Sequence, residues 1–166
     1  MDKMQKKTGK SRRGNRAAAK PTVSNRFYLF FGIALAVIIL DQLTKLWALR
    51  ELQNPMPLIG NFLSFALVKN TGAGFGLFKG TNTLMIYLSL MVIGLILYFY
   101  DRIPDKLGIH ASVALILGGG IANLVDRVRL GYVLDFIDVS FWPTFNVADT
   151  AITLGVIGFL WFSWKD

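Results

Sequence analysis

Aspartates are the residues of this chain best suited to chemistry, because most other catalytic groups are missing. The 166 residues include no cysteine and a single histidine, His110. This composition excludes disulfides, a cysteine nucleophile and a multi-histidine metal site. A Ser-His-Asp triad is excluded because His110 lies at the start of an apolar segment (about 109–125), whereas Asp126, Asp135 and Asp149 lie beyond the other end of that segment. Ser64 and Lys69 could form a dyad, but residues five apart in a strand point to opposite faces.

Paired carboxylates are the chemistry that remains after this elimination. Two close aspartates in a site of low dielectric cannot both ionise readily, so one pKa rises and the pair shares a proton. Such a pair acts as acid and base together and can attack a peptide bond with water. We therefore expect no metal and no cofactor.

Four apolar segments predict the elements that position these acids. They lie at about 27–49, 84–100, 109–125 and 146–164. Each has about the length that ~30 Å of hydrocarbon requires at 1.5 Å per residue, and helices leave no backbone group unpaired there. Only 17% of the residues are charged and 54% are hydrophobic. The predicted fold class is a membrane protein, mainly α, with four transmembrane helices.

The net charge of +8 belongs to an N-terminal tail. Residues 1–26 hold nine basic residues and one acid, whereas residues 27–166 sum to zero. We expect a disordered cytoplasmic tail followed by a membrane domain over 27–166, since Lys and Arg stay on the cytoplasmic side. Attraction of the tail to anionic lipid or nucleic acid is the alternative. Four spans then place the connections at about 50–83 and 127–145 outside, with both termini in the cytoplasm.

The first outer connection predicts a small extracytoplasmic β platform at about 55–80. Residues 58–69 are rich in strand-forming types, and residues 70–76 supply the glycine and asparagine of tight turns. We expect this platform to lie on the outer membrane surface, where it could cover a site.

Polar residues from three predicted helices and from the second outer connection converge at the outer membrane face. They are Asp41, Gln42, Thr44 and Lys45, then Asn123, Asp126 and Arg127, then Asp135 and Asp138, and finally Asn146 and Asp149. Ionisable residues at membrane depth are costly, so this convergence indicates a functional site.

Each polar residue also has a structural interpretation. Asp41 and Lys45 are four residues apart and could form an ion pair on one helix face. Asn146 could cap the fourth helix, with Asp149 in its first turn. Asp135 could be an exposed loop acid. These interpretations account for the residues singly but not for their common depth.

Five short motifs resemble those of the lipoprotein signal peptidases (signal peptidase II), which are bacterial membrane aspartyl proteases. They are Asp-Gln-Leu-Thr-Lys at 41–45, Asn-Thr-Gly-Ala-Gly-Phe at 70–75, Gly-Gly-Ile-Ala-Asn-Leu-Val-Asp-Arg at 119–127, Val-Leu-Asp-Phe-Ile at 133–137 and Phe-Asn-Val-Ala-Asp at 145–149. The resemblance covers about 41–155. Gly74 and Ala122 depart from the family pattern, each replacing one small residue by another.

The resemblance implies a catalytic dyad of Asp135 and Asp149. From the residues alone, Asp126 competes with Asp135 for the first of these roles. The neighbouring Arg127 would hold Asp126 ionised, whereas the apolar neighbours of Asp135 suit a raised pKa. These neighbours do not exclude Asp126, but the resemblance also favours Asp135, and we therefore choose Asp135.

The resemblance also implies supporting residues and a reaction. Positioning of the dyad and the substrate falls to Asn70, Gly72, Asn123, Asp126, Arg127 and Asn146, and bracing to Asp41 and Lys45. The implied reaction removes the signal peptide from a diacylglyceryl-modified prolipoprotein, just before its lipidated cysteine. It takes place at the outer face of the bacterial cytoplasmic (inner) membrane. The expected partners are prolipoproteins and membrane lipids, with no nucleic acid, and we expect a monomer.

Two other functions compete with a peptidase. A membrane carrier or channel that uses buried acids needs polar residues along its full depth, and the cytoplasmic halves of the spans at 27–49, 84–100 and 146–164 are almost wholly apolar. A non-enzymatic factor that binds lipoproteins would need an apolar groove but not the acids.

Overall fold

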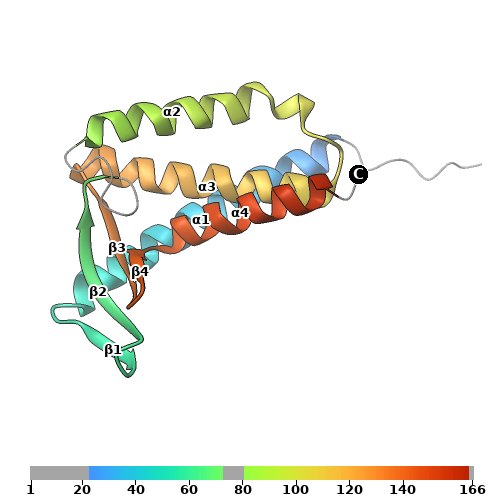
Figure 1. Cartoon of the computed structure of the whole chain (residues 1–166). Helices are drawn as coiled ribbons and strands as arrows, with labels where there is room; N and C mark the ends of the chain where they lie inside the picture. The colour runs from blue at the N-terminus through green and yellow to red at the C-terminus, as the bar shows by residue number, and fades with distance from the viewer. Residues whose placement is uncertain (1–22, 73–80, 165–166) are drawn as a thin grey trace, which may run out of the picture.

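Long helices form the body of the protein, and a small sheet lies across one end of them (Figure 1). The computed structural model describes residues 23–72 and 81–164. The elements in chain order are α1 (Val23–Glu51), β1 (Met56–Ile59), β2 (Leu63–Asn70), α2 (Asn82–Tyr98), a 3-10 helix (Tyr100–Arg102), α3 (Leu107–Leu130), β3 (Val133–Val139), β4 (Trp142–Phe145) and α4 (Val147–Trp164). Most of the predicted tail, residues 1–22, lies outside the described residues.

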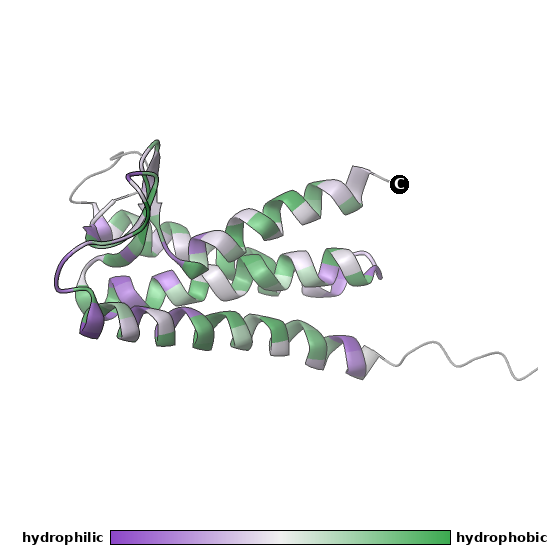
Figure 2. Ribbon diagram, turned by 90° about the horizontal axis from the view of Figure 1, so that it is seen from below, coloured by the Kyte–Doolittle hydropathy of each residue, from purple (hydrophilic) through white to green (hydrophobic). Residues whose placement is uncertain are grey.

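Helix α3 is the centre of the bundle, since α1, α2 and α4 all pack against it. Glycines allow two of these contacts to be close. A Cβ added at Gly118 would lie 2.6 Å from the carbonyl oxygen of Ala34 on α1. A Cβ added at Gly119 would lie 2.5 Å from the carbonyl oxygen of Ala148 on α4. Apolar residues dominate the helices (Figure 2), and many of their side chains are exposed, which suits a surface in contact with lipid.

The predicted spans are confirmed as apolar helices with shifted ends. Within the described residues, three helices are long and apolar enough to cross a membrane: α1 from Asn25, α3 and α4. Helix α2 is apolar but shorter, with 17 residues.

Helix α3 extends five residues beyond the predicted end at 125. Its last turns are polar and therefore lay outside the apolar pattern. Gly131 ends the helix in the left-handed conformation, with φ of 82°, and its N–H donates to the carbonyl of Arg127.

The predicted platform at 55–80 is only half of the sheet. All four strands are antiparallel in the order β1-β2-β3-β4, so the second connection supplies two of them. Val68 on β2 pairs with Asp135 on β3, and Asn70 pairs with Val133. The interpretation of Asp135 as an exposed loop acid is wrong, because it lies on a strand and is 1% exposed. Residues 73–80 of the predicted platform lie outside the described residues.

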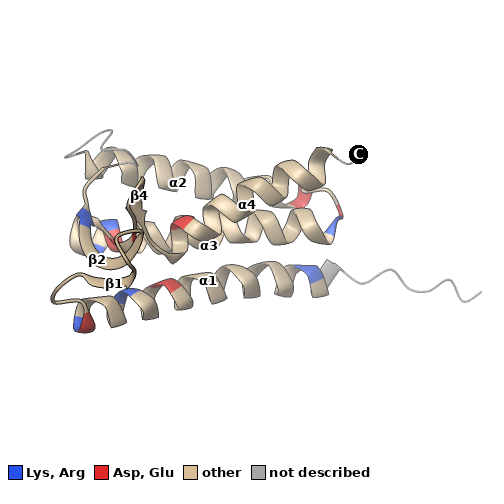
Figure 3. Ribbon diagram, turned by 60° about the horizontal axis from the view of Figure 1, so that its bottom comes forward, with Lys and Arg blue, Asp and Glu red and all other residues tan. Residues whose placement is uncertain are grey.

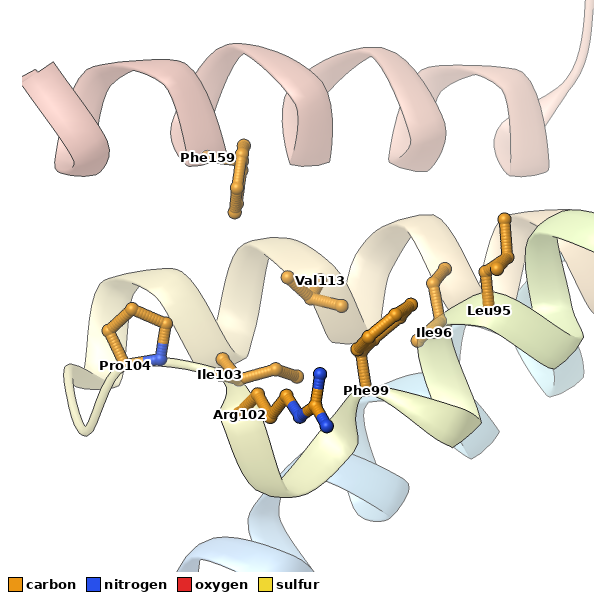
Figure 4. A pocket seen from close by; sticks show the side chains of 8 residues that line it. All are labelled: Leu95, Ile96, Phe99, Arg102, Ile103, Pro104, Val113 and Phe159. Atoms are coloured by element: carbon orange, nitrogen blue, oxygen red, sulfur yellow. The ribbon is translucent and has the colours of Figure 1, made fainter.

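Aromatic and apolar side chains pack the opposite end of the bundle. The ring centroids of Phe30 and Tyr100 are 4.9 Å apart, and His110 lies edge-on to both rings. As expected, His110 is far along α3 from the acidic residues. A cavity of about 330 Å³ at this end is lined by Leu95, Ile96, Phe99, Arg102, Ile103, Pro104, Val113 and Phe159 (Figure 4).

Candidate active site

One buried asparagine joins the two aspartates of the predicted dyad. The Asn146 side-chain nitrogen Nδ2 donates to Oδ1 of Asp135 at 2.7 Å. The Asn146 backbone N–H donates to Oδ2 of Asp149 at 3.3 Å. Asn146 is fully buried between β4 and α4. The sheet and the start of α4 therefore bring two carboxylates that are 14 residues apart onto the same residue.

The second oxygen of Asp135 is held from the neighbouring strand. Asn70, the last residue of β2, donates from Nδ2 to Oδ2 of Asp135 at 2.9 Å. The Asn70 oxygen Oδ1 accepts from the backbone N–H of Gly72 at 3.1 Å. Because the amide oxygen is engaged by this turn, its nitrogen is left to face the carboxylate. Asp135 therefore receives one amide donor on each oxygen.

The environment of Asp135 raises its pKa to about 7. Burial is the largest cause, and the negative charge of Asp149 adds to it. The hydrogen bonds from Asn70 and Asn146 and the positive charge of Lys45 act in the opposite direction. A carboxyl group with this pKa can both hold and release a proton near neutral pH.

Asp149 has a structural role as well as its place beside Asp135. Its N–H donates to Oδ1 of Asn146 at 2.8 Å, and its Oδ2 accepts from the Asn146 N–H. This is a reciprocal capping box at the start of α4, and the predicted capping roles of both residues are confirmed. The other oxygen of Asp149 accepts from Nδ2 of Asn123 at 2.8 Å. The side chain of Asp149 is therefore fixed from two helices.

A buried ion cluster, formed by Asp41, Lys45 and Asp126, lies behind these residues. The Lys45 ammonium is 2.8 Å from an oxygen of Asp41 and 2.8 Å from an oxygen of Asp126. It also donates to Oδ1 of Asn123 at 3.1 Å. All three members are nearly or completely buried, and buried charges are tolerated only when they are paired in this way. The predicted ion pair of Asp41 and Lys45 is thus confirmed and extended to α3.

The ion cluster holds the backbone just before each aspartate of the dyad. Asp41 accepts from the N–H of Ala148 at 2.9 Å, and Ala148 immediately precedes Asp149. Asp126 accepts from the N–H of Leu134 at 3.2 Å, and Leu134 immediately precedes Asp135. Lys45 connects the two acids of the cluster. One ammonium group therefore links the positions of both carboxylates.

Asp126, the competing candidate for the dyad, is engaged within this cluster. One of its oxygens contacts Lys45 and Leu134, and the other accepts from Nε2 of Gln42 at 2.9 Å. Lys45 therefore supplies the positive charge beside Asp126 that the sequence analysis expects from Arg127. Arg127 instead donates from Nη2 to the carbonyl of Gly72 at 3.4 Å.

Sequence reasoning missed two residues of the site. Gln42 was recognised as polar but received no role, although it stands next to Asp41 in the first motif. Asn82 begins α2 and donates to the carbonyl of Arg127 at 3.2 Å. An asparagine at a helix start has an ordinary capping interpretation, so no signal in the sequence singled it out.

The residues proposed for other chemistries are occupied elsewhere. Ser64 donates to Asp138 at 3.2 Å, and the Lys69 ammonium lies 5.3 Å from the centroid of the Tyr132 ring. Among the described residues, no group of three or more histidine, cysteine or acidic side chains could hold a metal ion. Figure 3 shows where the charged residues lie along the helices and around the sheet.

Comparisons with known proteins show a family and a fold to which this chain is similar. Residues 33–165 match a family model described as Signal peptidase (SPase) II. A lipoprotein signal peptidase of Moorella thermoacetica is 41% identical over 135 residues, which are 80% of this chain and 90% of that protein. One of Halothermothrix orenii is 34% identical over 81% of this chain and 94% of that protein. A solved bacterial membrane enzyme superposes with a TM-score of 0.74 at 29% identity, over 89% of this chain and 92% of that one.

Proposed function

This chain belongs to the signal peptidase II family, and we propose that it is an aspartic endopeptidase that removes signal peptides from diacylglyceryl-modified prolipoproteins. Cleavage takes place just before the lipidated cysteine, with Asp135 and Asp149 as the catalytic pair. The names of the relatives support removal of signal peptides from prolipoproteins. The aspartic mechanism and its residues are our inference from the site.

The observation that carries this proposal is the contact of Asn146 with both carboxylates. A dyad works only when two acids face the same substrate bond with one proton between them. Asn146 orients both acids, while Asn70 and Asn123 each orient the remaining oxygen of one acid.

In the proposed mechanism the two acids exchange roles through one proton. The ionised aspartate takes a proton from water, and the protonated one donates to the scissile carbonyl oxygen. The resulting tetrahedral gem-diol collapses, and a proton returns to the leaving amine. A pKa of about 7 for Asp135 supports a pair that holds one proton at neutral pH. No metal or cofactor takes part.

The remaining site residues are assigned supporting roles. Gly72 and Arg127 join the turn after β2 to α3, close to Asn70. The ion cluster of Asp41, Lys45 and Asp126 braces the backbone next to both catalytic residues. These residues position the reacting groups and do not exchange protons with the substrate.

The protein is a multi-pass membrane protein, and we infer four spans with α2 as the shortest. Seventeen residues rise about 26 Å as a helix, slightly less than the ~30 Å of a hydrocarbon core, and a bilayer adapts to such a mismatch at modest cost. The basic segment 1–26 and both termini then lie in the cytoplasm. The membrane domain over 27–166 works as a monomer in the bacterial inner membrane, with the sheet and the catalytic pair at the outer face.

The two competing functions have little support. The relatives are peptidases by name, not carriers, channels or binding factors. A transport path would also need polar groups through the middle of the bundle. There, α3 contributes apolar and glycine residues such as Val113, Leu117 and Gly118.

Cleavage of a lipidated prolipoprotein by the purified full-length protein tests this function. The released product is followed as a shift on a gel. We expect Asp135→Asn and Asp149→Asn each to lower the rate by about a thousandfold or more, because each removes one partner of the proton exchange. Asp138→Asn is the matched control on the same strand. Its side chain contacts Ser64 and not the dyad, so cleavage should remain close to the wild-type rate.

Three results would redirect the proposal. Normal cleavage by both Asp135→Asn and Asp149→Asn would exclude the dyad. Loss of cleavage in Asp126→Asn together with activity in Asp135→Asn would move the first catalytic role to Asp126. Labelling experiments that place Asp149 on the cytoplasmic side would exclude the topology as well.

A further inference from the structure

A cleft at the end of the bundle opposite the sheet lies between α2 and α4, on the surface of α3 (Figure 4). Its volume is about 330 Å³, which is within the size range of ligand pockets. Leu95 and Phe99 of α2 and Phe159 of α4 line it and are 48%, 40% and 39% exposed. Val113 of α3 lines it as well and is buried. The cleft is therefore apolar and open toward the lipid around the bundle.

One charged side chain, that of Arg102, belongs to this lining. Its guanidinium carbon lies 5.2 Å from the centroid of the Phe99 ring, and Figure 4 shows the two side chains next to each other. A cation–π contact of this kind uses none of the N–H donors of the guanidinium. Among the residues that the structure describes, Arg102 pairs with no carboxylate, whereas Arg26 at the same end pairs with Asp105. The donors of Arg102 are therefore available to an anion at the cleft.

The backbone holds Arg102 at the edge of the cleft. Its N–H donates to the carbonyl of Phe99 at 2.9 Å. Arg102 comes shortly after Tyr98, the last residue of α2, and therefore lies near the polar boundary of the hydrocarbon, at the level of lipid phosphates. The stretch from Leu95 to Arg102 rises about 10 Å along the helix axis. The cleft thus extends from the headgroup level into the hydrocarbon of one leaflet.

We propose that this cleft binds a phospholipid with an anionic headgroup, such as phosphatidylglycerol, from the leaflet opposite the sheet. Arg102 donates hydrogen bonds to its phosphate, and the first part of one acyl chain lies between Phe99 and Phe159. Residues 1–26, which carry the net charge of +8, lead into α1 at this same end, and basic segments beside a membrane attract anionic lipid. The lipid is not the substrate, so the inference requires membrane insertion of the bundle but not the peptidase mechanism.

The signal peptide of a substrate is the competing occupant of this cleft. A signal peptide is an apolar segment that follows a basic N-terminal region. In the proposed topology, that basic region would lie beside Arg102 and the basic residues of 1–26, where like charges repel. A helix about 10 Å across and 10 Å long also occupies about 800 Å³, which is more than twice the volume of the cleft. Charge and size therefore both favour a lipid.

Native mass spectrometry of the full-length protein in detergent measures the binding of individual lipids. The protein is titrated with dioleoyl phosphatidylglycerol, with dioleoyl phosphatidylcholine and with glycerol 1-phosphate, which has a phosphate but no acyl chain. We expect the first phosphatidylglycerol to bind about tenfold more tightly than the first phosphatidylcholine, because the choline cation offsets the charge of the phosphate. Glycerol 1-phosphate should not bind detectably. Equal binding of the two lipids would overturn the proposal.

A pair of charge substitutions tests the role assigned to Arg102. Arg102→Gln removes the cation at the cleft, and Arg50→Gln makes the same change at an exposed cation in the last turn of α1, at the sheet end. We expect Arg102→Gln to lower the preference for phosphatidylglycerol from about tenfold to about twofold, whereas Arg50→Gln should preserve it. An equal loss in the two variants, or no loss in Arg102→Gln, would show that the lipid responds to net charge alone and would overturn the proposal.

A pair of tryptophan substitutions tests the cleft itself. Leu95→Trp fills the cleft, and Leu97→Trp makes the same change on the same helix at a residue outside the lining. The two leucines are 48% and 45% exposed. We expect Leu95→Trp to weaken binding of the first phosphatidylglycerol about tenfold, because the acyl chain loses its apolar contacts, and Leu97→Trp to leave it near wild type. Equal effects of the two variants would place the lipid elsewhere on the bundle.

The cleavage assay separates this inference from the proposed function. In detergent without added phospholipid, Leu95→Trp and Leu97→Trp should both keep the KM for a lipidated prolipoprotein near the wild-type value. A rise in KM in Leu95→Trp alone would place the substrate in the cleft and overturn the assignment to a phospholipid. Failure of the wild-type protein to cleave would overturn the peptidase function and leave the lipid site to be decided by the binding measurements.

Discussion

The two ends of the helical bundle are stabilised by different kinds of interaction. At the sheet end, Lys45 is buried between two carboxylates, and a chain of amides connects them to Asp135 and Asp149. At the opposite end, Phe30 is fully buried against the ring of Tyr100 and the aliphatic side chains of α3. The same helices α1 and α3 contribute to both ends.

This difference indicates that the polar end is arranged for chemistry rather than for stability. Replacing buried ion pairs by well-packed apolar residues is often neutral or stabilising. The opposite end shows that α1 and α3 can pack in that way. The buried charges at the sheet end therefore have another role. They accept hydrogen bonds from the backbone N–H groups of Leu134 and Ala148 and so fix the positions of these two residues.

Removal of the Lys45 ammonium, which lies at the centre of the ion cluster, should lower stability more than the other substitutions at either end of the bundle. Lys45→Met leaves Asp41 and Asp126 buried without their counter-ion, and we expect the free energy of unfolding to fall by about 3–5 kcal/mol. Cleavage should fall with it, because the backbone next to both proposed catalytic residues loses its support. Unfolding in detergent and the cleavage assay measure the two effects. A triple variant that also carries Asp41→Asn and Asp126→Asn should regain part of the stability but little activity.

A Lys45→Met protein as stable as the wild type would contradict this view. It would mean that the two carboxylates are neutral or hydrated without the lysine, and that the ion cluster does not brace the site.

Two glycine-to-alanine substitutions compare the sheet end of the interface between α3 and α4 with the middle of that interface. A Cβ at Gly119 would lie 2.5 Å from the carbonyl oxygen of Ala148, and one at Gly155 would lie 2.6 Å from that of Ser112. Each alanine variant should lose about 1–3 kcal/mol of stability, since α3 and α4 must move apart. Only Gly119→Ala displaces the peptide next to Asp149, so its kcat should fall by about a hundredfold. Equal kcat losses in the two variants would show that catalysis depends on overall packing.

A pH titration of stability tests the buried carboxyl at the sheet end. The folded-state pKa of Asp135 is about 7, against a reference value of 3.8. The folded protein therefore binds the proton more tightly, and the contribution to stability is complete below pH 3.8 and is lost as the pH rises toward 7. We expect the unfolding free energy to fall by about 4 kcal/mol over this window, because each pKa unit corresponds to about 1.4 kcal/mol. Asp135→Asn should flatten that decrease, and an unchanged slope in this variant would contradict the raised pKa.

The features that the sequence predicted well are local in the chain. Hydrophobic runs predicted the helices, and spacings of three and four residues predicted the cap formed by Asn146 and Asp149 and the pair formed by Asp41 and Lys45. Each of these depends on residues within one or two helical turns. The gathering of polar residues at one end of the bundle followed from the helix ends.

The features that the sequence did not reveal depend on distant contacts. The contact of Lys45 with Asp126 joins residues 81 positions apart, and the pairing of β2 with β3 brings Val68 beside Asp135. Neither contact leaves a periodic pattern in the chain. The strand character of β3 was also hidden, because Asp135 and Asp138 interrupt its apolar residues.

An ion pair at the opposite end of the bundle should have the smallest effect. Arg26 at the start of α1 pairs with Asp105 just before α3, and the Asp105 side chain is 76% exposed. Water and salt screen such a pair, so Asp105→Asn should change the unfolding free energy by about 0.5 kcal/mol or less and leave cleavage unchanged. Lys45 and Arg26 each pair a positive charge with an aspartate, and the two pairs differ only in their burial and in their partners. A stability loss in Asp105→Asn as large as that in Lys45→Met would mean that both ends depend on ion pairs, and the functional explanation of the buried cluster would lose its basis.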